Sequence, residues 1–301
     1  MSALSVVVVS SEGRAPAVVG VDEPVVAADD LGLTRGDGCF EGLRLVRGAD
    51  GAVVVPNAAA HLARLQRSAR SLDLPDDPAP WARALDVVAQ QWATTSPDGD
   101  EAAVKLSVTR GRPAPAGATA TPTVVVTVSA VDASLLRARR EGVRVASMTR
   151  GYSADAFADA PWLLGGVKTL SYAVHTAAQR EAARRGADDA LFTAADGSLL
   201  EAPTASVLWV PGPGDLRTVA QGDNGILGST TQHLLFDRAR RAGWRATETT
   251  GTLDDLRSAR VVLLTSAVRG PVRVVQLDGE PVSQHASAAE VTAELQGLAG
   301  F

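Results

Sequence analysis

The order of the apolar segments is the sequence feature that most limits the fold. Short runs rich in β-branched residues, such as 5–10 and 121–131, are interleaved with longer segments whose apolar residues recur at helical spacing, such as 57–74 and 81–95. A doubly wound parallel sheet would need a regular strand–helix–strand period, and this chain has none. The pattern predicts an α+β fold.

A polar segment at 132–142, DASLLRARREG, divides the chain. We therefore predict an N-terminal α/β domain at 1–131, a connector at 132–142 and a C-terminal domain at 143–301. A chain of 301 residues is long enough for two domains with substantial cores.

The local patterns also predict individual elements. In the first domain we expect strands at 5–10, 16–26, 103–111 and 121–131, a hairpin closed near 49–51, helices at 57–74 and 81–95, and a loop at 111–122. In the second domain we expect strands at 143–148, 206–211, 260–268 and 272–282, a hairpin over 189–203, helices at 168–185 and about 230–242, and a C-terminal helix.

Composition excludes several classes of function. The net charge of −5 gives no electrostatic reason to expect nucleic acid. No apolar run approaches the roughly 18 residues that a membrane span needs, and the N-terminus is typical of a strand and not of a signal peptide. A single cysteine, Cys39, and four scattered histidines predict no disulfide and no metal site. We expect a soluble, cytoplasmic, metal-free protein.

Two nucleotide signatures are also missing. The glycines of RGDGCFEG, at 36, 38 and 42, miss the G-x-G-x-x-G spacing, and no G-x-x-x-x-G-K-S/T occurs. A dinucleotide oxidoreductase or an ATPase is therefore disfavoured.

Lysine is almost absent from this chain. Of 29 basic residues only Lys105 and Lys168 are lysines, and arginine cannot replace lysine as an amine nucleophile. Lys168 follows Gly165 and Gly166 at the start of a predicted helix, where a partly buried amine would suit Schiff-base formation. Lys105 lies in an alternating strand and is explained by a charged head in water. Chance survival is the alternative for either lysine.

Two further features fit a pyridoxal phosphate site. The segment NGILGSTTQHLL, 224–235, leads small polar residues into a helix, whose N-terminus can bind a phosphate; the alternative is an ordinary N-cap. Glu201 follows an apolar hairpin strand and could hold the cofactor's pyridine nitrogen protonated. The alternative for Glu201 is a surface carboxylate.

From about Asp30 to Asp278 the chain resembles the class IV aminotransferases, the fold-type IV pyridoxal-phosphate enzymes. That family includes branched-chain and D-amino acid aminotransferases and aminodeoxychorismate lyase. The segments that carry the resemblance are DLGLTRGDGCFEGLR, HLARLQRSA, GVKTLSYA, DGSLLEAPTASV, GILGSTTQ and TSAVRGPVRVVQLDG, in this order. The resemblance implies a two-domain fold like that of D-amino acid aminotransferase, with a smaller N-terminal domain, a larger C-terminal domain and the cofactor between them.

The resemblance also implies roles for individual residues. Lys168 would bind pyridoxal 5'-phosphate covalently and move the substrate Cα proton, and Glu201 would pair with the pyridine nitrogen. The other implied cofactor contacts are Arg64, the backbone N–H groups of Thr230 and Thr231 and the hydroxyl of Ser266 at the phosphate, and Tyr172 at the ring oxygen. A homodimer acting on a small-molecule substrate is implied as well.

Four positions depart from the family pattern. Where the phosphate loop usually reads L-P-G-x-T-R, this chain has Gly228, Ser229 and Gln232 in place of proline, glycine and arginine. Ser206 replaces the usual asparagine five residues after Glu201.

The reaction depends on weaker signals. RGDGCF and VKTLSY favour aminodeoxychorismate lyase, which converts 4-amino-4-deoxychorismate to 4-aminobenzoate and pyruvate in folate biosynthesis, whereas Glu41 favours a transaminase. Arg110 and Arg112 could bind a substrate carboxylate; the alternative is ordinary loop arginines. We predict the lyase, with a branched-chain or D-amino acid aminotransferase as the alternative and a non-catalytic ligand-binding relative as a remote one.

Overall fold

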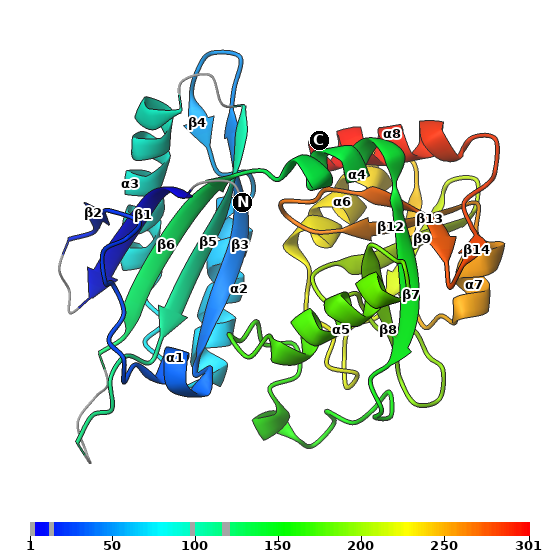
Figure 1. The fold of residues 1–301 in the computed structure, drawn as a ribbon. Coiled ribbons are helices and arrows are strands. Elements are labelled where there is room, and N and C mark those ends of the chain that lie inside the picture. Colours follow the sequence, from blue (N-terminus) through cyan, green and yellow to red (C-terminus); the bar gives the residue numbers. More distant parts are fainter. Residues whose placement is uncertain (1–3, 12–14, 97–99, 116–120) are drawn as a thin grey trace. The chain divides into compact units, whose positions relative to one another are not determined.

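The computed structural model describes residues 4–11, 15–96, 100–115 and 121–301, and these form two compact units (Figure 1). Unit 1 contains the described residues up to Asp132 together with Val167–Ser171. Unit 2 contains Ala133–Gly166 and Tyr172–Phe301. Both units combine helices with a sheet, so the predicted two-domain α+β fold is confirmed.

Unit 1 is built on an antiparallel sheet of strand order β2-β1-β6-β5-β3-β4. Its strands are β1 (Leu4–Ser11), β2 (Ala17–Val19), β3 (Gly38–Arg47), β4 (Val53–Val54), β5 (Glu101–Thr109) and β6 (Thr123–Ala130). Its helices are α1 (Leu31–Arg35), α2 (Ala58–Ser71) and α3 (Ala79–Thr95).

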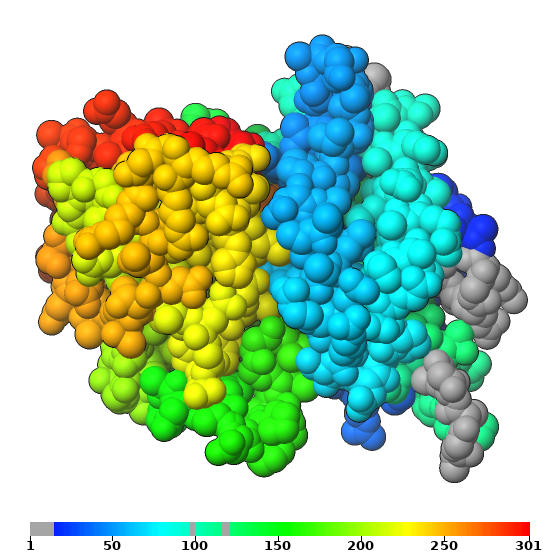
Figure 2. All heavy atoms as spheres, turned by 180° about the vertical axis from the view of Figure 1, so that it is seen from behind, coloured from blue at the N-terminus to red at the C-terminus, as the bar shows by residue number. Residues whose placement is uncertain are grey.

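The core of unit 1 lies between one face of this sheet and helices α2 and α3. Alternate residues of β3, such as Leu43 and Leu45, are fully buried together with Leu65 of α2 and Trp81 of α3. In the view from behind, the atoms of α2 and α3 cover this face (Figure 2). The even-numbered residues of β3, including Phe40, therefore lie on the opposite face of the sheet.

Unit 2 is built on a mixed sheet of order β11-β10-β9-β12-β13-β7-β8, with β14 paired to β13. Its strands are β7 (Val143–Thr149), β8 (Asp189–Thr193), β9 (Ser206–Gly212), β10 (Asp215–Val219), β11 (Arg245–Thr249), β12 (Val261–Thr265), β13 (Val272–Leu277) and β14 (Glu280–Pro281). Its helices are α4 (Ala133–Glu141), the short 3-10 helix Pro161–Leu163, α5 (Ala173–Arg184), α6 (Thr230–Arg241), α7 (Leu253–Ser258) and α8 (Ala288–Ala299).

The sheet of unit 2 is buried on both faces. Along β12, Val262 and Leu264 join a core that includes residues of α5 and α7, whereas Val261 and Leu263 join a core with α6 and α8. A continuous apolar run is typical of such a doubly covered strand. The strand that ends at Thr265 is therefore held rigidly, just before Ser266.

The segment predicted as a connector contains helix α4, because its leucine, alanine and arginine residues favour helix. Two expectations about local structure were wrong. The predicted strand 16–26 is reduced to Ala17–Val19, since Gly20 and Pro24 interrupt it. The helix expected from Lys168 begins at Ala173, because residues 168–170 instead make backbone hydrogen bonds to β3. Part of the predicted loop 111–122, residues 116–120, lies outside the described residues.

Candidate active site

Residues Val167–Ser171 lie alongside the first residues of β3 in unit 1 and are hydrogen-bonded to them. Phe40 donates its backbone N–H to the carbonyl of Lys168 at 3.0 Å, and Leu170 donates to Gly38 at 2.9 Å. The N–H of Lys168 in turn donates to Ser68 Oγ of α2 at 3.2 Å. Hydrogen bonds to a strand and to a helix thus fix the backbone of the lysine from both sides.

The two glycines before this segment have separate structural reasons. A Cβ added at Gly165 would lie 2.6 Å from the Phe157 ring, and Gly166 has a φ of +72°, which favours glycine. The close approach at Gly165 is thus to a phenylalanine of unit 2.

The two lysines of the chain contact the same ring. Lys168 Nζ lies 4.5 Å from the centroid of Phe40, and Lys105 Nζ lies 4.9 Å from it. Because both distances run to one point, the nitrogens are at most about 9.4 Å apart, the sum of the two. Partial burial lowers the pKa of Lys105. We had expected the Lys105 amine to lie in water. In the β3–β5 register Lys105 is opposite Gly42 and therefore diagonal to Phe40, which explains its contact with the ring.

Arg64 belongs to a buried cluster with Glu41 and His61. Its Nε and Nη2 each donate to one carboxylate oxygen of Glu41 at 2.7 Å, and His61 Nδ1 lies 2.8 Å from Glu41 Oε2. Glu41 is 1% exposed and Arg64 7%. Burial alone would raise the pKa of Glu41, but the hydrogen bonds from Arg64 and His61 hold it below its usual value.

The two candidate substrate arginines are both ion-paired. Arg110 Nε donates to Asp37 Oδ2 at 2.6 Å, and Arg112 Nε donates to Asp29 Oδ1 at 2.8 Å. The pair of Arg112 is exposed on the surface. Each aspartate engages Nε and Nη2 of its arginine, so a substrate carboxylate would have to use the other donors or displace the aspartate.

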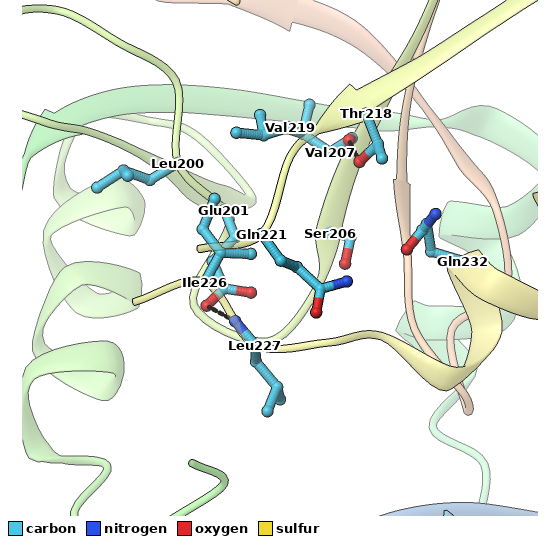
Figure 3. A pocket seen from close by; sticks show the side chains of 10 residues that line it. All are labelled: Leu200, Glu201, Ser206, Val207, Thr218, Val219, Gln221, Ile226, Leu227 and Gln232. Carbon is cyan, nitrogen blue, oxygen red and sulfur yellow. Dashed lines mark hydrogen bonds between the residues drawn. The ribbon is translucent and has the colours of Figure 1, made fainter. Parts of the chain in front are cut away.

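In unit 2, Glu201 lies at the end of the predicted hairpin, where its carbonyl accepts the N–H of Phe192 at 3.0 Å. Its Oε1 accepts the backbone N–H of Leu227 at 3.1 Å (Figure 3). The carboxylate lines a small pocket together with Ser206, Gln221 and Gln232. Glu201 is therefore held by the segment that leads into α6.

The first turn of α6 has the predicted form. Ser229 is the N-cap, and its Oγ accepts the N–H of Gln232 at 3.2 Å. Thr230 and Thr231 follow as the first two helical residues, and the first turn contains no acidic residue. The positive end of a helix dipole with a neutral first turn is suited to an anion.

Two polar atoms of unit 2 are buried with no hydrogen-bond partner among the described residues: Gln232 Nε2, in this turn, and Thr265 Oγ1, at the end of β12. Thr265 pairs with Ser206 in the β12–β9 register, and Ser206 lines the same pocket as Gln232. Two of the positions that depart from the family pattern, Ser206 and Gln232, thus line one pocket.

Tyr172 directly precedes α5, and its ring stacks on His175 with centroids 4.5 Å apart. Ser266 follows the last residue of β12. Unit 1 therefore brings Lys168 close to α2, the helix of Arg64, whereas Glu201, Thr230, Thr231, Ser266 and Tyr172 belong to unit 2.

Two negative findings apply to the part of the chain that the structure describes. No helix there is long and apolar enough to cross a membrane. No group of three or more histidine, cysteine, aspartate or glutamate residues is placed to hold a metal ion.

The two-unit α+β architecture is that of the fold-type IV enzymes. The family model for amino-transferase class IV matches residues 38–277, and the chain belongs to this family of pyridoxal-phosphate-dependent enzymes. A bifunctional aminodeoxychorismate lyase / D-amino acid transaminase from Mycobacterium tuberculosis is 39% identical over 287 residues, which cover 90% of this chain and 92% of that protein.

Solved structures agree with this assignment. A hypothetical aminotransferase from Mycobacterium tuberculosis in its PLP-bound form has a TM-score of 0.86 at 39% identity, covering 97% of this chain and 98% of the other. A fold IV-transaminase from Curtobacterium pusillum has a TM-score of 0.85 at 36% identity, covering 98% and 99%.

Proposed function

We propose that the protein binds pyridoxal 5'-phosphate covalently through Lys168. The observation that carries this proposal is the placement of the lysine: its backbone is hydrogen-bonded to β3 and α2, and its amine lies against Phe40. An amine over an aromatic face has fewer water neighbours than one in bulk solvent, and a lysine held in a single position is suited to attack an aldehyde.

The other residues fit the cofactor's remaining groups. Glu201, oriented by the Leu227 N–H, would pair with the pyridine nitrogen. The N–H groups of Thr230 and Thr231, the Ser266 hydroxyl and the Arg64 guanidinium would hold the phosphate, and Tyr172 the ring oxygen. When bound, pyridoxal phosphate supplies an electron-withdrawing ring that stabilises negative charge at the substrate Cα.

We infer that the reaction is that of aminodeoxychorismate lyase, in which 4-amino-4-deoxychorismate yields 4-aminobenzoate and pyruvate. Lys168 would take the substrate proton and Glu201 would keep the pyridine nitrogen protonated. The similarity to the bifunctional Mycobacterium tuberculosis enzyme supports this inference. Arg110 and Arg112 would contribute to carboxylate binding through the donors that their aspartates do not engage, or by exchanging the aspartates for the substrate.

Transamination of D-amino acids is the second candidate, and the name of the same relative favours it. The two reactions share the first proton transfer from the substrate, so the cofactor contacts do not distinguish them. In transamination Lys168 would return the proton to the cofactor carbon instead of allowing elimination.

A competition experiment separates the two reactions. The holoenzyme is given 4-amino-4-deoxychorismate, or D-alanine or L-leucine with 2-oxoglutarate, and 4-aminobenzoate and glutamate are followed. We expect 4-aminobenzoate to form faster than glutamate. Rapid glutamate formation without 4-aminobenzoate would assign the protein to the aminotransferases.

We also propose a homodimer. Three apolar side chains of unit 2 near the lysine segment in sequence are exposed: Trp162 (74%), Leu163 (49%) and Val174 (58%). Trp162 and Leu163 are adjacent, and neighbouring exposed apolar side chains support a surface that a partner covers. Sedimentation of a fully active monomer at micromolar concentration would contradict the dimer.

A further inference from the structure

Glu41 has two bonded partners on α2. Arg64 reaches it with two parallel N–H···O bonds of 2.7 Å, and His61 reaches it with a contact of 2.8 Å. His61 and Arg64 are three residues apart, so they lie on one face of the helix. The carboxylate therefore fixes both the position and the plane of the guanidinium.

This face of α2 also contacts the lysine segment. Ser68 lies one turn beyond Arg64 and accepts the N–H of Lys168 at 3.2 Å. From the other side, Phe40, the neighbour of Glu41 in β3, contacts the Lys168 carbonyl and amine. One strand and one helix thus connect the cluster to the proposed cofactor lysine.

A role in stability alone does not account for the geometry of the Arg64–Glu41 pair. Elsewhere in the same sheet, Arg44 Nη1 lies 3.3 Å from Glu101 Oε2. The Arg64 pair is shorter, bidentate and more deeply buried. A guanidinium whose one edge is bound bidentately has its rotation blocked, and its remaining donors keep a fixed direction.

We propose that Glu41 and His61 are positioning residues that hold the Arg64 guanidinium in the orientation needed to bind a phosphate monoester. This inference rests on the proposed function, in which Arg64 contacts the cofactor phosphate. It also gives Glu41 a different role from that of a marker for transamination: its side chain lies on the helix-covered face of the sheet and acts through Arg64.

The test compares the affinities of the cofactor-free protein for pyridoxal phosphate and for pyridoxal, which has the same aldehyde without the phosphate. Both are measured from the absorbance of the adduct at Lys168. In Glu41→Gln the charge is lost at constant shape, and we expect about tenfold weaker binding of pyridoxal phosphate, as for a hydrogen bond to a charged group. Pyridoxal binding should change less than twofold.

His61→Asn is the milder variant and should lower the same affinity ratio by about threefold. Glu101→Gln is the matched control, since it breaks the other Arg–Glu pair of the sheet, and its ratio should equal that of the wild type. Equal losses for both ligands in Glu41→Gln, or an unchanged ratio in both cluster variants, would overturn the inference. A wild-type protein that binds neither aldehyde at Lys168 would instead overturn the proposed function.

Discussion

Two regions of this molecule are proposed to bind one phosphate group, and they differ in how their polar atoms are satisfied. In unit 1, Arg64 is bound by Glu41 within a buried cluster. In unit 2, the first turn of α6 has Gln232 Nε2 buried with no partner among the described residues. The first region is neutralised by its own side chains, whereas the second contains a buried amide nitrogen with no partner among the described residues.

The polar groups of the two regions therefore depend on the ligand in different ways. A buried arginine that loses its carboxylate destabilises the fold, because an unpaired buried charge is costly. An unsatisfied neutral amide or helix N-terminus costs less free energy than an unpaired charge. Such groups can therefore remain without a ligand until one binds. Loss of a cluster side chain in unit 1 should therefore destabilise the cofactor-free protein. Unit 2 should depend on its polar side chains mainly when the cofactor is bound.

The largest expected effect is on stability in unit 1. Arg64→Met leaves Glu41 buried beside His61 alone, which should lower the free energy of unfolding of the cofactor-free protein by about 3–5 kcal/mol. Chemical denaturation measures the change. A loss below about 1 kcal/mol would show that the cluster does not need its arginine.

The second effect should concern catalysis in unit 2. Glu201→Gln keeps the shape of the side chain but removes its charge, so the cofactor-bound enzyme should lose about 3 kcal/mol of transition-state stabilisation. Turnover of the preferred substrate is the measurement, with cofactor binding at Lys168 as the control. Turnover close to that of the wild type would exclude Glu201 from pairing with the pyridine nitrogen.

The third effect has the opposite sign. Gln232→Met replaces a buried unsatisfied amide with an apolar side chain of similar length, so the cofactor-free protein should gain up to about 1 kcal/mol. Denaturation of this variant beside Arg64→Met tests the comparison directly. If both variants are destabilised to the same extent, the two regions do not differ as described.

The smallest effect concerns pH and Glu41. Because its pKa is lower in the folded protein than its ordinary value of 4.5, ionised Glu41 favours the folded state above about pH 4.5. That contribution is lost as the pH falls through the folded pKa. Glu41→Gln should therefore flatten the acid limb of the stability profile below pH 4.5, and an unchanged slope would contradict the assignment.

Much of the fold could be predicted from sequence because its signals are local. The hairpin turn at Asp196-Gly197 and the N-cap Ser229 follow from residues a few positions apart. The loss of helix at Lys168 could not be predicted in this way, since it depends on hydrogen bonds to β3, more than a hundred residues earlier. Local propensity yields to such tertiary contacts.

The candidate site shows the same division. Lys168 and Glu201 stand out in sequence because lysine is rare and the acid follows an apolar hairpin. The partners of the charged residues do not stand out: Glu41 with Arg64, Asp37 with Arg110, and Lys105 with Phe40 all join separate elements. Their pairing depends on strand register and on which face of a helix is buried.

Identification of the labelled peptide after reduction tests directly whether Lys168 is the cofactor lysine. The protein is incubated with pyridoxal phosphate and reduced with borohydride, and the labelled peptide is identified by mass spectrometry. Only two lysines are available, and both contact Phe40, so Lys105 is an internal control for simple proximity. We expect a stoichiometric label on Lys168 and none on Lys105. A label on Lys105, or equal labelling of the two lysines, would contradict the assignment of Lys168 as the cofactor lysine.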